Sequence, residues 1–350
     1  MPGMWRAALA LIMVAAPAFA QEAAISSKPI VIAHRGASGE RPEHTLAAYE
    51  LAIEQGADFI EPDLVMTKDG QLVARHENNI TDTTDVSSRS EFRDRKATKV
   101  IDGTKHSGWF TEDFTLAELK TLRAKERLPL LRRGSTKFDG QFEVPTLREV
   151  IALAKSASTK TGRTIGIYPE TKHPTYFASI GLPLEAALVA ELKAAGWDRA
   201  DAPVFIQSFE VNNLKALKLL TKVRLIQLLD ADGGPADAAQ PSYAAMITPD
   251  GLKGIAAYAA GIGPAKGMVV ANDGTVTPLV TEAHAAGLKV HPWTFRAENF
   301  FLPSGLRAGI NPAGHGRLGD EISRHLAAGV DGFFTDFPYQ GVEARDGHVR

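Results

Sequence analysis

A short apolar run near the start of the chain is followed at once by charged residues. Residues 30–33 (Ile-Val-Ile-Ala) are typical of a buried strand of a parallel sheet, and His34 and Arg35 come directly after them. Residues 42–56 place apolar side chains at helical spacing, with Thr45 as a candidate cap and Gly56 as the stop. Residues 59–64 are again apolar in the manner of a strand. This pattern predicts a strand, a helix and a second strand in succession.

The same alternation resumes after residue 144 and continues almost to the end of the chain. The expected strands are residues 164–168, 204–206, 223–229, 267–271, 288–290 and 330–335. The expected helices are residues 146–158, 184–195, 211–220, 249–260, 277–286 and 318–328. With the first two strands, these make eight. The sequence therefore predicts an α/β fold, a (β/α)8 TIM barrel, with functional groups at the carboxyl ends of the strands.

Residues 80–144 depart from this rhythm. They are rich in Thr, Asp, Arg and Lys, and Trp109 and Phe110 are among their few clear apolar anchors. We interpret them as an insertion of short helices and loops after the second strand, within one barrel domain over residues 30–340. We expect their mixed charges, including those of residues 123–133, to form a solvated surface. The insertion should shape access to the site without supplying catalytic groups.

Two carboxylates share one face of the second predicted strand. Glu61 and Asp63 are two residues apart, so their side chains point the same way beside apolar neighbours. Two unpaired anions there would repel and would lose solvation, and a bound cation would relieve both costs. A turn at residues 68–70 then returns the chain to His76. Together with His34 at the end of the first strand, this set suggests metal-assisted phosphoryl chemistry.

In their order, these motifs resemble the glycerophosphodiester phosphodiesterase family. That family has a His-Arg-Gly motif, a Pro-Glu-Asn-Thr helix start, a Glu-x-Asp strand and a later His. The chain has His34-Arg35-Gly36, Pro42-Glu43-His44-Thr45, Glu61-Pro62-Asp63 and His76. Later blocks match as well, so the resemblance covers Ile30 to Pro338. The departure is His44, where the family usually has Asn, and we expect that position to help hold the loop. The long spacing after His76 resembles the exported, periplasmic branch.

The resemblance implies a metal site and an acid–base pair. It assigns Glu61, Asp63 and Glu170 to one divalent cation, and an all-carboxylate site suits a hard ion such as Ca²⁺ or Mg²⁺. The likeness to calcium-dependent exported enzymes favours Ca²⁺. His34 and His76 would be the general base and general acid, because an imidazole titrates near neutrality.

The resemblance also implies which residues bind the substrate. Arg35 and Lys172 would hold the phosphate oxygens beside the cation. Phe209, Trp293 and Phe295 would line the alcohol side of the pocket. These roles complete the site that the sequence predicts.

The implied reaction is hydrolysis of glycerophosphodiesters, such as glycerophosphocholine and glycerophosphoethanolamine, to sn-glycerol 3-phosphate and an alcohol. The nucleophile, water or the glycerol 2-hydroxyl, stays open, as do the head group and the division of acid and base roles. One alternative is a phospholipase-type barrel acting on intact lipids, which would need an exposed apolar rim. The other is an exported binding protein without turnover, which should lack at least one of His34, His76, Glu61, Asp63 and Glu170.

The beginning of the chain and its composition concern location and partners. Residues 1–20 have the features of a secretory signal, with Arg6, an apolar stretch and Ala18-Phe19-Ala20 as a cleavage site. We expect cleavage after Ala20, export to the periplasm and no stable membrane anchor thereafter. A net charge of −2, from 39 basic and 41 acidic residues, indicates no nucleic-acid partner. The absence of cysteine excludes disulfides, thiol catalysis and cysteine-bound metals. The oligomeric state stays open.

Overall fold

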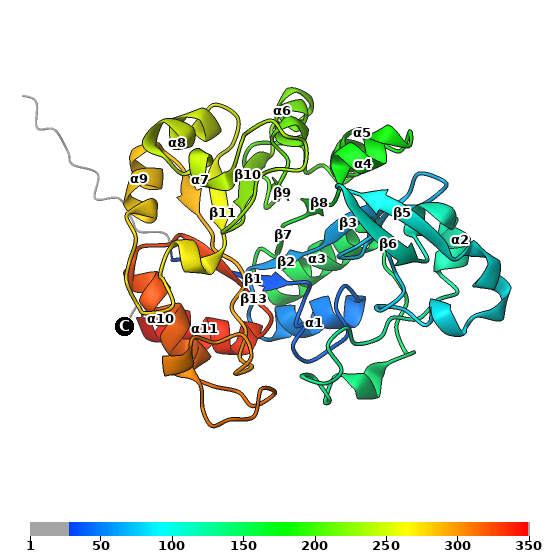
Figure 1. The fold of residues 1–350 in the computed structure, drawn as a ribbon, viewed down its shortest axis with the longest axis horizontal. Coiled ribbons are helices and arrows are strands. Elements are labelled where there is room, and N and C mark those ends of the chain that lie inside the picture. Colours follow the sequence, from blue (N-terminus) through cyan, green and yellow to red (C-terminus); the bar gives the residue numbers. More distant parts are fainter. Residues whose placement is uncertain (1–27, 349–350) are drawn as a thin grey trace, which may run out of the picture.

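The structure is a computed structural model that describes residues 28–348, in which parallel strands form a barrel with helices outside it (Figure 1). The barrel strands are β1 (Ile30–His34), β2 (Phe59–Glu61), β3 (Asp63–Met66), β7 (Gly166–Ile167), β8 (Glu170–Thr171), β9 (Phe205–Ser208), β10 (Arg224–Leu229), β11 (Gly261–Pro264), β12 (Lys289–Val290) and β13 (Gly332–Thr335). Pro62 separates β2 from β3, and Pro169 lies between β7 and β8, because proline lacks the N–H that continues a ladder. Each pair occupies one barrel position. Eight positions result among the described residues, which confirms the predicted fold class.

The barrel closes between its first and last strands. β1 pairs in parallel with β2 on one side and with β13 on the other, where Ile30 faces Gly332. Single bridges join Ile167 to Val204 and Phe295 to Thr335, which connects the two sheets into one ring. The interior is filled by a cluster of side chains from several strands: Ile32, Tyr168, Phe205, Ile226 and Phe334. The barrel is therefore a packed core, and its site lies at one end.

Helices cover the outside of the barrel. They are α1 (Leu46–Glu54), α3 (Leu147–Thr161), α4 (Pro174–Ser179), α5 (Leu184–Ala194), α6 (Val211–Leu220), α7 (Tyr243–Met246), α8 (Pro249–Ala256), α9 (Leu279–Ala285), α10 (Leu318–Ala327) and α11 (Pro338–His348). Thr45 caps α1 by accepting a hydrogen bond from the Ala48 N–H, as the sequence predicts. Thr146 and Glu149 form a reciprocal capping box at the start of α3. None of the helices in residues 28–348 is both long and apolar enough to span a bilayer.

One predicted strand is wrong in place. The sixth barrel strand is β11, and the expected strand at residues 267–271 is instead a 3₁₀ helix (Lys266–Met268) followed by an irregular segment. The strand was missed because glycines flank Ile262 on both sides. A Cβ on Gly261 would lie 2.7 Å from the backbone carbonyl oxygen of Lys289, which leaves no room for a side chain there. The first helix begins at Leu46, directly after the predicted cap Thr45.

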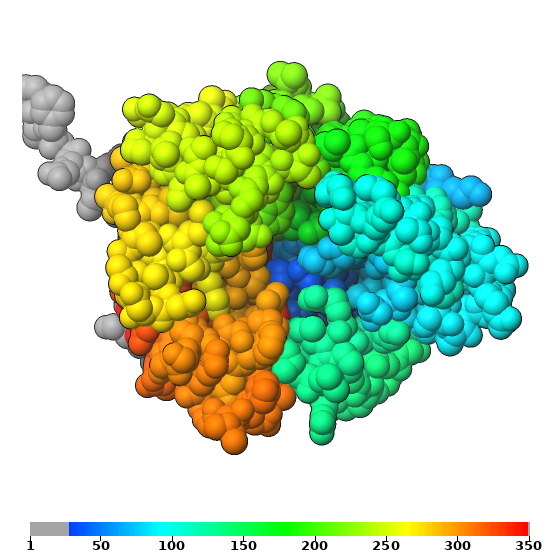
Figure 2. All heavy atoms as spheres, in the orientation of Figure 1, coloured from blue at the N-terminus to red at the C-terminus, as the bar shows by residue number. Residues whose placement is uncertain are grey.

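The insertion contains more regular structure than its sequence suggests. After the hairpin of β3 and β4 (Leu72–Ala74) come the antiparallel strands β5 (Ala97–Ile101) and β6 (Thr104–Gly108) and helix α2 (Leu116–Leu119). Four 3₁₀ helices complete it: Val86–Ser88, Ser90–Arg95, Thr111–Asp113 and Thr136–Phe138; another, Ser304–Leu306, lies near α10. The β5–β6 turn, Asp102-Gly103, has positive φ at both residues, a hairpin signal that the composition obscured. In Figure 2 the insertion, cyan to blue-green, borders the hollow at the barrel's end.

Candidate active site

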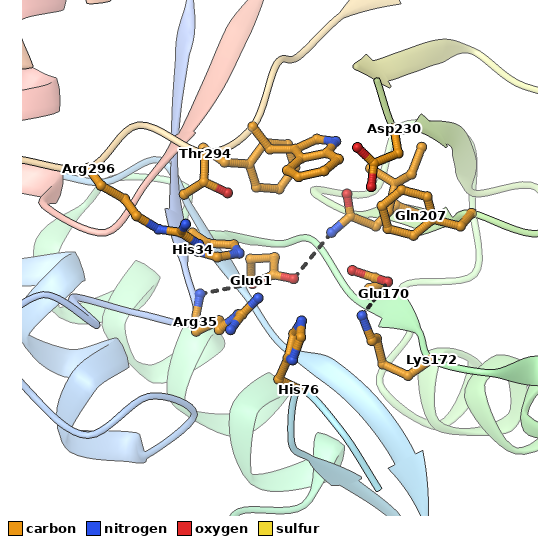
Figure 3. A pocket seen from close by; sticks show the side chains of 14 residues that line it. His34, Arg35, Glu61, His76, Glu170, Lys172, Gln207, Asp230, Thr294 and Arg296 are labelled. Carbon is orange, nitrogen blue, oxygen red and sulfur yellow. Dashed lines mark hydrogen bonds and ion pairs between the residues drawn. The ribbon is translucent and has the colours of Figure 1, made fainter. Parts of the chain in front are cut away.

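A cavity of about 280 Å³ opens at the carboxyl ends of the barrel strands. Its charged lining residues come from strands far apart in the sequence. They are His34 at the end of β1, Arg35 directly after it, Glu61 in β2, and Glu170 and Lys172 in and after β8. Figure 3 shows these side chains directed toward a common space. The barrel thus brings together the residues that the sequence places at separate strand ends.

Three carboxylates lie side by side next to this cavity, and two of them, Glu61 and Glu170, line it. Glu61, Asp63 and Glu170 each offer one oxygen, and these oxygens lie within 4.8 Å of one another. The register explains the cluster, because Asp63 pairs with Glu170 across β3 and β8. All three side chains are buried, and Asp63 Oδ1 has no hydrogen-bond partner. These buried oxygens fit the needs of a divalent cation that prefers carboxylate ligands.

The pKa values of the three carboxyl groups are shifted in different directions by their surroundings. Burial and then the neighbouring Asp63 raise the pKa of Glu61 well above its usual range. Burial raises the pKa of Glu170 to about 8, although Lys172 Nζ lies 3.0 Å away. Burial acts on Asp63 in the same direction, but Arg35 and His44 hold its pKa well below the usual range. An ionised Glu61 is therefore costly unless further positive charge is supplied.

His44 contacts the carboxylate cluster as well as holding the loop. It is fully buried; its Nε2 lies 2.9 Å from Asp63 Oδ2 and its Nδ1 lies 2.8 Å from the Tyr49 hydroxyl. Its backbone φ is +55°, a left-handed conformation that asparagine tolerates well. The expected role in the loop is thus joined by a contact to Asp63 that the sequence did not predict.

His34 is oriented by a carboxylate from the last strand. Its Nδ1 lies 2.6 Å from Asp336 Oδ1. Burial favours the neutral form of Asp336, but the charges of Arg132 and Arg296 hold its pKa well below the usual range. An ionised carboxylate can only accept, so Nδ1 carries the proton and the other ring nitrogen, Nε2, is left as an acceptor. Burial and then Arg35 lower the pKa of His34 to about 4, which favours the neutral imidazole.

His76 is arranged in a similar way at another edge of the cavity. Its Nδ1 lies 3.0 Å from Glu77 Oε1, and Glu77 Oε2 is bound by His173 Nε2 at 2.8 Å. Burial and the cations Arg35 and Lys172 lower the pKa of His76. Figure 3 shows its ring pointing into the cavity. His34 and His76 therefore line one cavity, and each has a carboxylate partner at Nδ1.

Cations and aromatic rings complete the lining. Arg35 Nε lies 3.2 Å from Asp63 Oδ2, and its backbone N–H donates to Glu61 Oε2. Phe209 and Trp293 line the cavity with ring centroids 5.7 Å apart and edge-to-face. Phe295 does not belong to this lining.

The predicted substrate contact of Phe295 is therefore wrong. Phe295 is fully buried and packs edge-to-face against His325 and Phe333. Residues two apart would share a face of a regular strand, but β12 ends at Val290 and this alternation does not hold at residues 293–295. Trp293 turns toward the cavity, whereas Phe295 contacts the helix layer.

Sequence reasoning gave no role to Asp336, Glu77, Arg296 and Arg132. Asp336 had a usable signal, because β13 neighbours β1 in a closed barrel and both end in polar residues. Arg132 contradicts the expectation of a solvated surface over residues 123–133, because its side chain is only 2% exposed and binds Asp336. No local pattern marks such a contact.

The chain is similar to known proteins over most of its length. The model of the glycerophosphoryl diester phosphodiesterase family matches residues 34–340. The chain is 38% identical to glycerophosphodiester phosphodiesterase GDPD6 of Arabidopsis thaliana, covering 89% of this chain and 84% of the relative. It is 32% identical to the glycerophosphodiester phosphodiesterase of Haemophilus influenzae, covering 91% and 90%.

Solved structures share the fold. A phosphodiesterase of Oleispira antarctica, determined in complex with the product sn-glycerol-3-phosphate, has a TM-score of 0.61 and 24% identity, covering 91% of this chain and 97% of that one. A structure described as a glycerophosphoryl diester phosphodiesterase of Silicibacter pomeroyi has a TM-score of 0.66 and 21% identity, covering 91% and 93%. At these identities the likeness concerns the fold alone.

Proposed function

The chain belongs to the glycerophosphoryl diester phosphodiesterase family, and we propose that it hydrolyses glycerophosphodiesters to sn-glycerol 3-phosphate and an alcohol. One observation carries this proposal: two imidazoles held through Nδ1 by carboxylates face the same cavity as three clustered carboxylates. The imidazoles can transfer protons, and a cation held by the carboxylates would offset the charge of the phosphate at the same place. Relatives with this named activity align over 84–93% of their length.

The residues that line the cavity have different roles in the proposed hydrolysis. His34 Nε2 takes the proton of the attacking hydroxyl, either water or the glycerol 2-hydroxyl, while Asp336 holds the ring in that tautomer. His76 gives a proton to the oxygen of the departing alcohol. The guanidinium of Arg35 and the ammonium of Lys172 hold the phosphoryl oxygens as charge develops on them.

Glu61, Asp63 and Glu170 would hold one divalent cation, because an all-carboxylate set suits a hard ion such as Ca²⁺ or Mg²⁺. We propose Ca²⁺ from the resemblance to the calcium-dependent exported branch of the family. When bound, the cation polarises a phosphoryl oxygen and offsets its charge. Lys172 contacts Glu170 and Arg35 contacts Asp63, and these cations offset part of the repulsion between the carboxylates.

The lining argues against an enzyme of intact lipids. Most groups of the cavity are charged or polar, and the adjoining pocket carries Asp102, Glu210, Asp230 and Asp232. A lipid-binding mouth needs apolar surface. Small soluble diesters are therefore the proposed substrates.

The test is an assay of the purified protein with glycerophosphocholine. We expect release of sn-glycerol 3-phosphate that stops with excess chelator and returns with Ca²⁺ better than with Mg²⁺. Full activity after exhaustive chelation would remove the metal from the proposal. Absence of turnover with every metal and several head groups would leave only a binding function.

We further propose that residues 1–20 direct export to the periplasm, as in the exported branch of the family. These residues lie outside the described part of the chain, and their Ala18-Phe19-Ala20 site supports the proposal. Amino-terminal sequencing of the protein from a periplasmic extract should begin at Gln21. Recovery of the intact amino terminus in the cytoplasm would contradict it.

A further inference from the structure

The insertion reaches the catalytic centre through one buried arginine. We propose that Arg132 is a positioning residue: it holds His34 in its reactive orientation through Asp336 and through the turn that follows His34. The inference rests on the proposed role of His34 as the base. It assigns to residues 80–144 a part in catalysis beyond shaping access to the cavity.

The first route runs through the Asp336 carboxylate. Asp336 Oδ1 contacts His34 Nδ1 at 2.6 Å, while Oδ2 accepts from Arg132 Nη2 and, at 2.9 Å, from Arg296 Nε. A carboxylate can rotate about its Cβ–Cγ bond, and donors on Oδ2 fix that rotation. Oδ1 therefore faces the imidazole because Oδ2 is held on the opposite side.

The second route runs through the backbone beside His34. Arg132 Nη1 donates to the Ser38 carbonyl at 2.9 Å, and the Ser38 hydroxyl donates to the His34 carbonyl at 2.8 Å. Arg132 thus restrains the turn after β1 as well as the ring of His34. Two independent restraints from one guanidinium exceed what a solitary ion pair would provide.

Burial distinguishes Arg132 from the other arginine on Asp336. The Arg132 side chain is 2% exposed, whereas that of Arg296 is 20% exposed and lines the cavity. Arg132 is itself anchored by Glu298, whose Oε1 accepts from its Nε at 2.6 Å and whose side chain is fully buried. The rigid anchor of Asp336 is therefore Arg132, since Arg296 also faces the space where substrate binds.

The experiment compares variants of this network by steady-state kinetics. Arg132→Met should lower kcat roughly tenfold or more while KM changes less than about twofold, because positioning of the base is lost and phosphate binding is kept. Glu298→Gln removes the buried negative charge that pairs with Arg132 but leaves the hydrogen bonds of Arg132 to Asp336 and Ser38. Its kcat should stay within about threefold of wild type. Lys99→Ala, which breaks the ion pairs of Lys99 with Glu112 and Asp113 in the same insertion, should have no effect on kcat.

A spectroscopic readout separates positioning from folding. With [¹⁵N]histidine labelling and His34→Gln to assign the signal, wild-type His34 should show a protonated Nδ1. Arg132→Met should show a mixture of tautomers. Arg132→Lys keeps the charge and replaces Arg132→Met if the methionine variant does not fold. Its fraction of His34 with a protonated Nδ1 should lie between those of wild type and Arg132→Met.

Two results would overturn the proposal. One is an equal loss of kcat in Arg132→Met and Glu298→Gln that follows their loss of thermal stability. The other is an unchanged His34 tautomer in a folded Arg132 variant. A fully active His34→Ala enzyme would instead overturn the proposed function, so the two failures are distinguishable.

Discussion

At the scale of single residues, each proposed acid–base group is a histidine held through Nδ1. Asp336 holds His34, and Glu77 holds His76. The two carboxylates differ in their surroundings. The Asp336 side chain is 2% exposed and is bound by two arginines, whereas that of Glu77 is 41% exposed and is shared with His173. Burial and then Arg35 lower the pKa of both histidines, so their pKa values do not separate the two roles. We propose His34 as the base because the buried Asp336 fixes its ring more firmly than Glu77 fixes that of His76, and we propose His76 as the acid.

Replacement of either histidine tests this division. His34→Ala and His76→Ala should each lose roughly a hundred- to ten-thousand-fold in kcat with glycerophosphocholine, because proton transfer by one side chain is worth that much. A p-nitrophenyl ester of glycerol phosphate has a leaving group that needs no proton. It should restore much of the rate of the His76 variant and little of the His34 variant.

The opposite pattern of rescue would exchange the two roles. His106→Ala is a suitable control, because His106 belongs to the insertion hairpin and lines the neighbouring pocket. It should retain nearly wild-type turnover with both substrates. Near wild-type rates in both His34 and His76 variants would end the acid–base interpretation.

At the scale of elements, strand alternation explains what the sequence could predict. Glu61 and Asp63 share a face because they are two residues apart, and Glu170 meets Asp63 because parallel neighbours align their polar ends. Only short-range pattern is needed for such predictions. The β5–β6 hairpin and β11 were not predicted, because charged or glycine-rich strands lack the periodic apolar residues by which a strand is identified.

The hairpin is tied to the barrel by a charged histidine. His173, just after β8, contacts Asp102 in the β5–β6 turn and Glu77 beside His76. Burial and Lys172 oppose its charge, but the two carboxylates raise the pKa of His173 to about 9. Because this value exceeds the usual 6.5, its stabilisation is complete below pH 6.5 and is lost as pH rises through 9.

His173→Asn should therefore lower the free energy of unfolding more at pH 6 than at pH 10. We expect a loss on the order of 1–2 kcal/mol at pH 6, discounted from the full shift because Glu77 is partly solvated. Asparagine tolerates the φ of +48° at this position, so backbone strain is not the cause. Denaturant unfolding at both pH values measures the difference. An equal loss at pH 6 and pH 10 would show that charge is not responsible.

At the scale of the whole molecule, closure of the barrel decides which distant residues meet. His34 and Asp336 are neighbours because β1 pairs with β13, and a sequence that predicts the barrel also predicts their proximity. Arg132 is different: it lies in a segment without helical or strand periodicity, 204 residues from Asp336. Its contact follows from the path of the insertion over the barrel, which pattern reasoning does not supply.

Cation binding should also act on the stability of the whole barrel, because the three carboxylates come from β2, β3 and β8. A ligand that binds the folded state at a hundredfold excess over its Kd adds about 2.7 kcal/mol. Ca²⁺ should therefore raise the Tm of the wild-type protein by a few degrees at a fixed scan rate. The raised pKa of Glu61 indicates that its charge costs free energy in the cation-free protein.

Glu61→Gln should remove the cost of the Glu61 charge in the absence of a cation and should weaken the stabilisation by Ca²⁺. In excess chelator its Tm should equal or exceed that of wild type, because a buried anion has been removed and Gln207, whose Oε1 has no partner, can turn its amide to pair with the new side chain. In Ca²⁺ its Tm should fall below that of wild type, because a hard anionic ligand is missing. Glu210→Gln is the matched control: Glu210 is also buried, but it binds Thr175 outside the carboxylate cluster, so its Tm should respond to Ca²⁺ as wild type does. A Glu61→Gln protein that gains as much Tm from Ca²⁺ as wild type would exclude Glu61 as a ligand.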